Sequence, residues 1–80
     1  MTLTIYSKPG CHLCDEMKAV VRRVVQRRAD ISLEEVDISS DAALLERYGM
    51  EIPVLLIDGT RAAKYRITEE QLTQALDRRR

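Results

Sequence analysis

The sequence predicts an α/β protein with the element order βαβαββα, in which one four-stranded mixed sheet carries helices on both faces. Three observations predict this class. Segments with strand patterns alternate with segments of helical periodicity. A helix separates the first two strands, which favours a parallel pair joined by a right-handed crossover. The dipeptide Asp58-Gly59 separates the last two strands and is typical of a tight antiparallel hairpin.

The first half of the chain supplies two strands and the helix between them. Residues 3–6 alternate apolar and polar side chains and stop at a Pro-Gly loop, so they form the first strand. Residues 12–28 form a helix, because their apolar residues have the spacing of one buried stripe: Leu13, Met17, Val20, Val21, Val24 and Val25. Residues 31–38 form the second strand, although the alternation slips at Glu34-Glu35.

The second half supplies a short helix, a hairpin and a final helix. Residues 40–48 form the short helix, and Gly49 is placed to end it in a left-handed conformation. Residues 53–57 are continuously apolar, as expected for a central strand buried on both faces, and residues 60–65 form the antiparallel edge strand. Thr68 and Gln71 fit a capping box that begins the last helix, residues 68–78.

The length and net charge of the chain limit its possible functions. Eighty residues allow a single domain, residues 1–80, and the lack of Phe and Trp implies an aliphatic core. Thirteen basic and thirteen acidic residues cancel, which argues against nucleic acid or an anionic membrane as partner. Apolar runs of four or five residues are too short to span a bilayer, and the N-terminus does not resemble a secretory signal. We therefore expect a cytoplasmic monomer without nucleic-acid or membrane partners.

The two cysteines, Cys11 and Cys14, stand at the start of the first helix with two residues between them. Side chains three apart on a helix have Cβ atoms about 5–6 Å apart, and a small adjustment brings the sulfurs within disulfide range. A closed zinc site needs four ligands, whereas this turn offers two Cys and His12. The spacing therefore indicates a reversible dithiol and no metal site.

The position of Cys11 at the helix head predicts that it is the more reactive of the two. A free thiol has a pKa of about 8.5, which helix N-termini and nearby cations lower. The amides of Leu13 and Cys14 lie within reach of the Cys11 sulfur, and Lys8 and His12 add positive charge, against Asp15 and Glu16. We expect Cys11 to attack a substrate disulfide and Cys14 to resolve the mixed disulfide. His12 has an alternative interpretation as an ordinary exposed residue.

Several segments together resemble the glutaredoxin branch of the thioredoxin superfamily, in particular its compact glutaredoxin-like proteins. The segments are Ile5-Tyr6-Ser7-Lys8-Pro9-Gly10-Cys11-His12-Leu13-Cys14, Glu35-Val36-Asp37, Leu45-Glu46-Arg47-Tyr48-Gly49, and Ile52-Pro53-Val54-Leu55 with Asp58-Gly59. The resemblance spans the chain and implies a minimal thioredoxin fold with catalytic Cys11 and Cys14. It also implies a cis Pro53, a Lys8 that helps to bind the carboxylate of glutathione, and an Ile52 backbone that faces the sulfurs and pairs with substrate. Together with His12, these are the expected substrate-binding residues.

The chain departs from typical glutaredoxins around this site. His12 and Leu13 stand between the cysteines where those proteins have Pro and Tyr, and residues 64–68 replace a Gly-Gly pair and an acidic residue that receive glutathione. The Trp-Ser-Gly-Phe-Arg-Pro segment of small redoxins that use thioredoxin reductase is missing too. Lys64 and Arg66 either bind a substrate carboxylate or protect an edge strand from aggregation. Two electron donors are therefore considered, glutathione and a protein of the thioredoxin-reductase type.

The expected function is that of a glutaredoxin-like thiol-disulfide oxidoreductase in electron transport, acting on protein or low-molecular-weight disulfides. This chemistry requires no metal or organic cofactor, and glutathione is a candidate co-substrate. One alternative is a glutathione-dependent iron-sulfur cluster carrier, since no Pro follows Cys11, although the missing Gly-Gly pair argues against it. Another is a non-catalytic interaction domain that retains the fold.

The order of attack predicts different outcomes for the two serine variants. Cys11→Ser abolishes turnover because it removes the attacking sulfur, whereas Cys14→Ser leaves the mixed disulfide unresolved. Mass spectrometry of the protein after incubation with a disulfide substrate should detect a covalent adduct only in Cys14→Ser. Equal activity in both variants would contradict the assignment.

Overall fold

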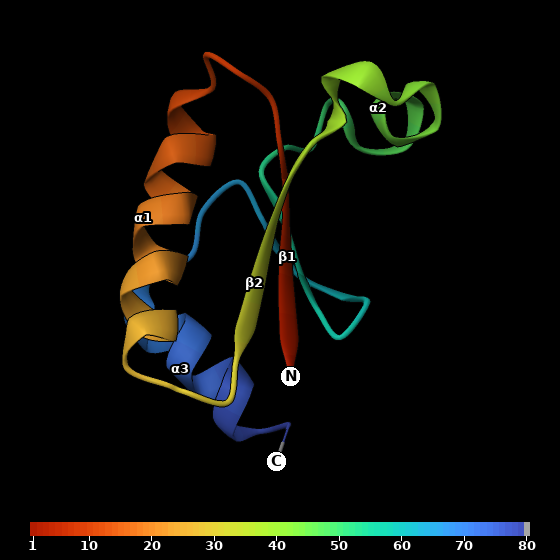
Figure 1. The fold of residues 1–80 in the computed structure, drawn as a ribbon. Coiled ribbons are helices and arrows are strands. Elements are labelled where there is room, and N and C mark those ends of the chain that lie inside the picture. The colour runs from red at the N-terminus through yellow and green to blue at the C-terminus, as the bar shows by residue number, and fades with distance from the viewer. Residues whose placement is uncertain (80) are drawn as a thin grey trace.

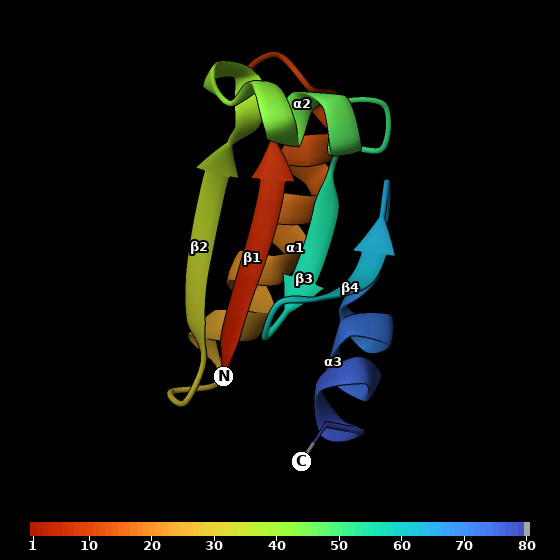
Figure 2. The ribbon, with the colours of Figure 1, turned by 90° about the vertical axis from the view of Figure 1, so that its right-hand side faces the viewer.

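The computed structural model describes residues 1–79, and Arg80, which the expected domain of residues 1–80 includes, lies outside the described residues. The elements follow the predicted order, with one additional 3₁₀ turn, η1 (Figures 1 and 2). They are β1 (Thr2–Ser7), α1 (His12–Gln26), β2 (Ser32–Asp37), η1 (Ile38–Ser40), α2 (Ala42–Tyr48), β3 (Val54–Ile57), β4 (Thr60–Lys64) and α3 (Glu69–Asp77).

The four strands form one mixed sheet in the order β2-β1-β3-β4. β1 and β2 are parallel, while β3 runs antiparallel to both β1 and β4. All four residues of β3 are buried, which confirms the prediction of a central strand. Because Tyr6 near the end of β1 is opposite Val54 at the start of β3, the β1–α1 loop and the segment entering β3 lie at the same end of the sheet (Figure 2).

Helices lie on both sides of the sheet, as predicted, but the two sides are unequal. α1 and α3 pack on one face, and α2 lies on the other near the end of β1 (Figure 1). The core between the sheet and the α1–α3 layer is aliphatic and consists of Leu3, Ile5, Met17, Val21, Val24, Ile31, Leu55, Ile57, Leu72 and Leu76. α2 has no fully buried residue, and Tyr48 packs its ring against Tyr6 with centroids 4.9 Å apart. The position of α1 therefore depends on the larger core.

The irregular alternation of β2 has a structural cause. Leu33 and Glu35 are opposite Leu3 and Ile5 in the parallel register and share the face that α1 covers. On this face Glu35 forms an ion pair with Arg22 of α1, with its Oε2 2.7 Å from the guanidinium Nε. The charged residue is tolerated there because β2 is an edge strand and α1 supplies the opposite charge.

Some predicted boundaries differ from the structure. α1 ends at Gln26 and not at residue 28, because the N–H groups of Arg27 and Arg28 already donate to carbonyls three residues back. The expected helix 40–48 is divided at Asp41, which ends η1 and caps α2.

The left-handed conformation expected for Gly49 is wrong: its φ is −54°, and a Cβ there would lie 2.5 Å from the Leu45 carbonyl oxygen. Close approach to α2 therefore explains the glycine.

The hairpin and the last helix confirm the local predictions. Asp58 and Gly59 have φ values of 48° and 83°, the sign that a type I′ turn requires at both central positions. Thr68 and Gln71 form the predicted capping box, each accepting from the backbone N–H of the other. Both features depend on residues adjacent in sequence, which is why sequence patterns locate them.

A cluster of ion pairs joins α1 to α3. The carboxylate of Glu69, in the first turn of α3, accepts hydrogen bonds from Arg23 and Arg27, both at 2.8 Å. Arg28 forms a third pair with Asp77 at the other end of α3. The hydrogen bonds from Arg27 and Arg23 lower the pKa of the Glu69 carboxyl below its ordinary value of 4.5. The ionised carboxylate therefore favours the folded state.

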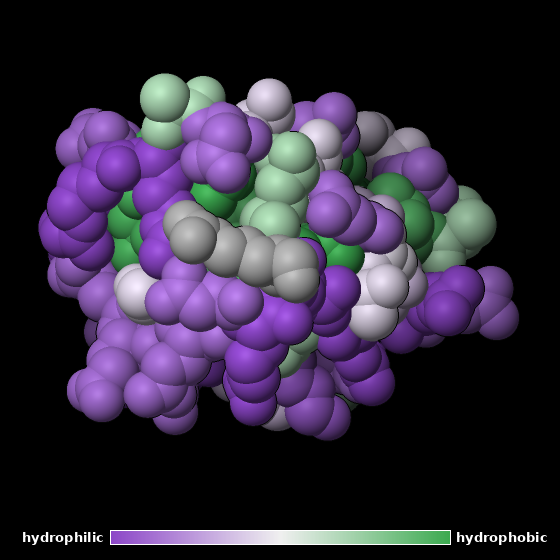
Figure 3. Space-filling model, turned by 90° about the horizontal axis from the view of Figure 1, so that it is seen from below, coloured by the Kyte–Doolittle hydropathy of each residue, from purple (hydrophilic) through white to green (hydrophobic). Residues whose placement is uncertain are grey.

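Figure 3 views the end of the molecule opposite the β1–α1 loop, and most of the surface seen there is hydrophilic. No helix within residues 1–79 is both long and apolar enough to cross a membrane.

The lowered pKa of Glu69 predicts part of the acid sensitivity of the fold. A carboxyl group with a lowered pKa in the folded state contributes its full stability above its ordinary value of 4.5 and loses it as the pH falls through the lowered pKa. Glu69→Gln should therefore reduce stability at neutral pH and flatten its decline below pH 4.5. Urea unfolding between about pH 3 and pH 7 measures this. The exposed neighbour Glu70→Gln is the control, and an unchanged profile in Glu69→Gln would refute the prediction.

Candidate active site

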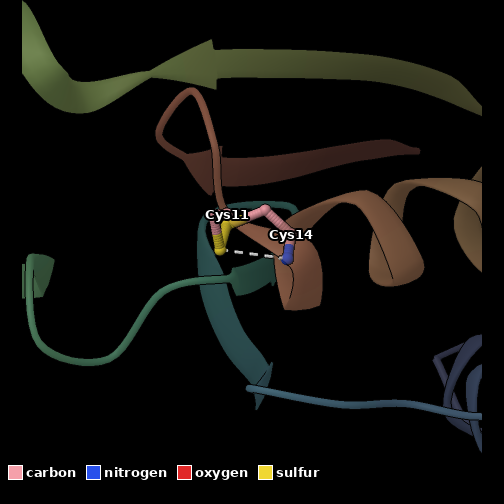
Figure 4. The surroundings of a disulfide bond; sticks show 2 residues. All are labelled: Cys11 and Cys14. Atoms are coloured by element: carbon pink, nitrogen blue, oxygen red, sulfur yellow. Dashed lines mark hydrogen bonds between the residues drawn. A yellow bond between two sulfur atoms is a disulfide. The ribbon is translucent and has the colours of Figure 1, made fainter.

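Cys11 is the N-cap residue of α1. Its backbone is extended, with φ −96° and ψ 110°, and its carbonyl accepts from the N–H of Asp15 at 3.1 Å. Its sulfur accepts from the backbone N–H of Cys14, with an N···Sγ distance of 3.1 Å (Figure 4). The sulfur thus occupies the place of the oxygen of a Ser or Asp cap, which satisfies one of the free amides of the first turn. The predicted amide contact from Cys14 is present.

The two cysteines form a disulfide, and their Cα atoms are 5.2 Å apart (Figure 4). Cys14 has no solvent exposure, whereas Cys11 is only partly buried. This difference follows from their positions, because Cys11 precedes the helix while Cys14 lies on the stripe that faces the core. Cys11 is therefore partly accessible to solvent, and Cys14 is not.

Lys8 and His12 lie on either side of Cys11 in the sequence. Lys8 is partly buried in the β1–α1 loop, and His12 is exposed as the first residue of α1. Gly10 between them has φ 78°, a left-handed conformation that turns the chain into the helix at little cost for glycine. Within residues 1–79 neither Lys8 nor His12 forms an ion pair, and no group of three His, Cys, Asp or Glu side chains could hold a metal ion.

Ile52 and Pro53 approach this end of the sheet from the other half of the chain. The peptide bond between them is cis, as the family resemblance implied. Pro53 is buried, and its carbonyl accepts from the N–H of Tyr65 at 2.8 Å. Ile52 is partly buried, and its backbone N–H and C=O have no hydrogen-bond partner within residues 1–79. Its backbone is therefore free to pair with another chain.

Sequence reasoning did not identify Tyr65 or Met50. Tyr65 has φ 68°, which is uncommon outside glycine, and its hydroxyl donates to the carbonyl of Met50 at 3.2 Å. Met50 is 92% exposed and Tyr65 41%, so apolar surface borders the segment before Pro53. Lys64, considered as a substrate contact, lies with its Nζ 3.8 Å from Glu51 Oε2. The only sequence signal at Tyr65 is the lack of glycine where the resemblance expects it.

A four-stranded mixed sheet with a Cys-x-x-Cys disulfide at the head of its first helix and a cis proline before β3 defines a protein of the thioredoxin fold. Residues 2–77 match the model of the glutaredoxin-like domain family (DUF836), and the chain belongs to this family.

Individual relatives agree with this assignment. The glutaredoxin-like protein YDR286C homolog of Dictyostelium discoideum is 26% identical, over 96% of this chain and 76% of that protein. The X-ray structure of the structural-genomics target XcR50 from X. campestris is 30% identical with a TM-score of 0.74, over 95% of this chain and 96% of that one. E. coli glutaredoxin is 17% identical with a TM-score of 0.66, over 99% and 96% of the two chains, and supports the fold alone.

The N-cap contact predicts a stabilised thiolate at Cys11 in the reduced protein. A helix N-terminus and an N–H donor favour the charged sulfur, so we expect the Cys11 pKa to lie below that of an unperturbed thiol, about 8.5. Thiolate absorbance followed against pH measures it, with the unfolded protein in urea as reference. If His12 contributes to this lowering, the Cys11 pKa in His12→Ala lies closer to that of the unfolded protein. Identical folded and unfolded titrations would contradict the prediction.

Proposed function

We propose that the protein is a thiol-disulfide oxidoreductase in which Cys11 is the attacking and Cys14 the resolving residue. One observation carries this proposal. At the head of α1 the Cys11 sulfur accepts a hydrogen bond from the backbone N–H of Cys14, and it is bonded to the Cys14 sulfur. An acceptor position at a helix N-terminus favours a thiolate, and a partner within bonding distance allows the thiolate to be regenerated after attack.

The reaction transfers two electrons from the protein dithiol to the substrate disulfide in two exchange steps. In the reduced protein, the Cys11 thiolate attacks one sulfur of the substrate disulfide, and the other substrate sulfur leaves as a thiolate that takes a proton from water. Cys14 then loses its proton and attacks the Cys11 sulfur of the mixed disulfide. The second substrate thiol leaves, and the protein is oxidised to the Cys11–Cys14 disulfide. An external dithiol, or two monothiols, reduces it again.

The exposure of the two sulfurs supports this division of roles. Cys14 is fully buried, so an external disulfide cannot reach it, but the Cys11 sulfur of a mixed disulfide lies beside it. The reverse assignment would require the first turn of α1 to open. Burial of Cys14 also removes its thiolate from competing external reactions.

Substrate binding in this proposal uses the segment before β3. Ile52 has a free backbone N–H and C=O within residues 1–79, so an extended peptide is able to add to it as a short strand. Pro53 fixes the direction of this segment, and its carbonyl is tied to Tyr65. Lys8, three residues before Cys11, provides positive charge for an anionic group of the substrate or donor, and the His12 imidazole offers a hydrogen bond to it.

The proposal predicts that reduced protein turns over a mixed disulfide and that Cys11→Ser does not. Turnover is measured with glutathione as donor and then with thioredoxin and thioredoxin reductase. Rates in one system well above the Cys11→Ser background identify the donor.

Other outcomes favour the alternatives. Failure of the disulfide to form and break across physiological potentials would contradict an oxidoreductase and favour an interaction domain. Anaerobic reconstitution with iron and sulfide that produced visible absorption, lost in Cys11→Ser, would instead favour a cluster carrier.

A further inference from the structure

A cavity of about 230 Å³ lies between the second turn of α1 and the connection from β4 to α3. Met17 and Val20 line it on the helix side, Tyr65, Arg66 and Ile67 line it on the other side, and Glu16 lies at the rim beside them. Met17 has almost no exposed surface and Ile67 is packed against the core, so the walls are largely apolar. The helical wall begins one turn after Cys14.

Both walls are connected to the candidate active site. Met17 follows Cys14 by three residues on α1, a spacing that places their side chains on the same face about 5–6 Å apart. On the opposite wall, the N–H of Tyr65 donates to the carbonyl of Pro53. Neither the cysteines nor the segment proposed to bind substrate lines the cavity, but each wall is one residue contact away from one of them.

Tyr65 is held in this wall at a conformational cost. Its φ of 68° and the hydrogen bond from the N–H of Arg66 to the carbonyl of Lys64, at 2.8 Å, form a tight γ-turn. Non-glycine residues in such conformations are uncommon and concentrate at functional sites. The Tyr65 hydroxyl donates to the Met50 carbonyl, which fixes the ring between the cavity and the loop before β3. A glycine would adopt this turn more easily but would leave the cavity without a wall.

The surroundings disfavour an anion in the cavity. The capping box of Thr68 and Gln71 already uses donors at the start of α3, and Glu70 places negative charge in its first turn, whereas the Glu69 carboxylate is paired with Arg23 and Arg27. Among the lining residues Glu16 is the one carboxylate and Arg66 the one cation, so the lining has no net charge that would attract an anion. The volume is also below the range of about 300–1,000 Å³ that is usual for small-molecule sites. One apolar side chain fits these constraints better than a charged ligand.

We propose that this cavity binds an apolar side chain of a polypeptide substrate, close in sequence to the cysteine that Cys11 attacks, and that Tyr65 is a specificity-determining residue. This inference rests on the proposed function, and the substrate class is polypeptides that carry the attacked cysteine in a disulfide. A peptide extended along Ile52 has side chains that alternate in direction, so one of them is available to enter the cavity. Burial of that side chain selects among disulfides that are chemically alike.

Matched peptides test the proposal. The substrates are mixed disulfides of thionitrobenzoate with peptides that differ only in the residues flanking the cysteine, which are leucine, glycine or aspartate, and with glutathione. Release of the coloured thiolate by the reduced protein, present in excess over the substrate, gives the second-order rate constant for each. We expect the leucine peptide to react roughly tenfold faster than the glycine peptide, the usual effect of filling an apolar pocket. Any advantage of glutathione or aspartate over glycine is assigned to Lys8, outside the cavity, and should persist when the cavity is filled.

Two variants assign the preference to the cavity. Val20→Trp fills it, and Tyr65→Gly removes a wall while suiting the positive φ. Both should bring the leucine-to-glycine ratio close to one. Ala19→Trp, at an exposed position outside the lining, is the control and should keep the wild-type ratio. A ratio is insensitive to a general loss of active protein.

The outcomes separate this inference from the proposed function. Equal rates for all peptides, well above Cys11→Ser, would overturn the cavity proposal and leave the oxidoreductase in place. A preference for glutathione or aspartate that Val20→Trp abolishes would also overturn it, because the cavity would then receive an anion. No release above background from any substrate would overturn both proposals.

Discussion

The hydrogen bond from the Cys14 amide to the Cys11 sulfur is the interaction on which the chemistry of the site depends. It exists because Cys11 is the N-cap of α1, with an extended backbone that follows the left-handed turn at Gly10. The remaining fold keeps this helix end in place. The aliphatic core anchors one face of α1 to the sheet, and ion pairs from Arg23 and Arg27 to Glu69 fasten it to α3. This hydrogen bond requires a fixed backbone geometry at the start of α1, and these contacts hold the helix in place.

Differences in burial separate the two cysteines, although they share one helical turn. Cys14 belongs to the apolar stripe of α1, whereas Cys11 precedes the helix and retains access to solvent. The antiparallel pairing of β3 with β1 then brings Ile52 and Pro53, some forty residues later in the chain, to the same end of the sheet. The cysteine pair and the segment before β3 lie at one end of the molecule because of this sheet topology.

The region before α3 is where this chain differs most from the glutaredoxins that its sequence resembles. Tyr65 adopts a left-handed conformation without glycine, and its side chain links the β4–α3 connection to Met50. The capping box of Thr68 and Gln71 already occupies donors at the start of α3. The largely apolar lining of the cavity beside this connection is the basis of the specificity that we propose.

The sequence by itself determined the features that depend on neighbouring residues: the Cys-x-x-Cys pair at a helix head, the Asp58-Gly59 turn, the capping box at Thr68 and the aliphatic strand of residues 53–57. Caps, turns and periodicity are local, so their residue signals are sufficient. Only the tertiary structure decided that Glu35 faces Arg22, that Gly49 is required by close approach to α2, and that Tyr65 lines a cavity against α1. These outcomes depend on contacts between residues far apart in the chain, where packing and charge pairing override local preference.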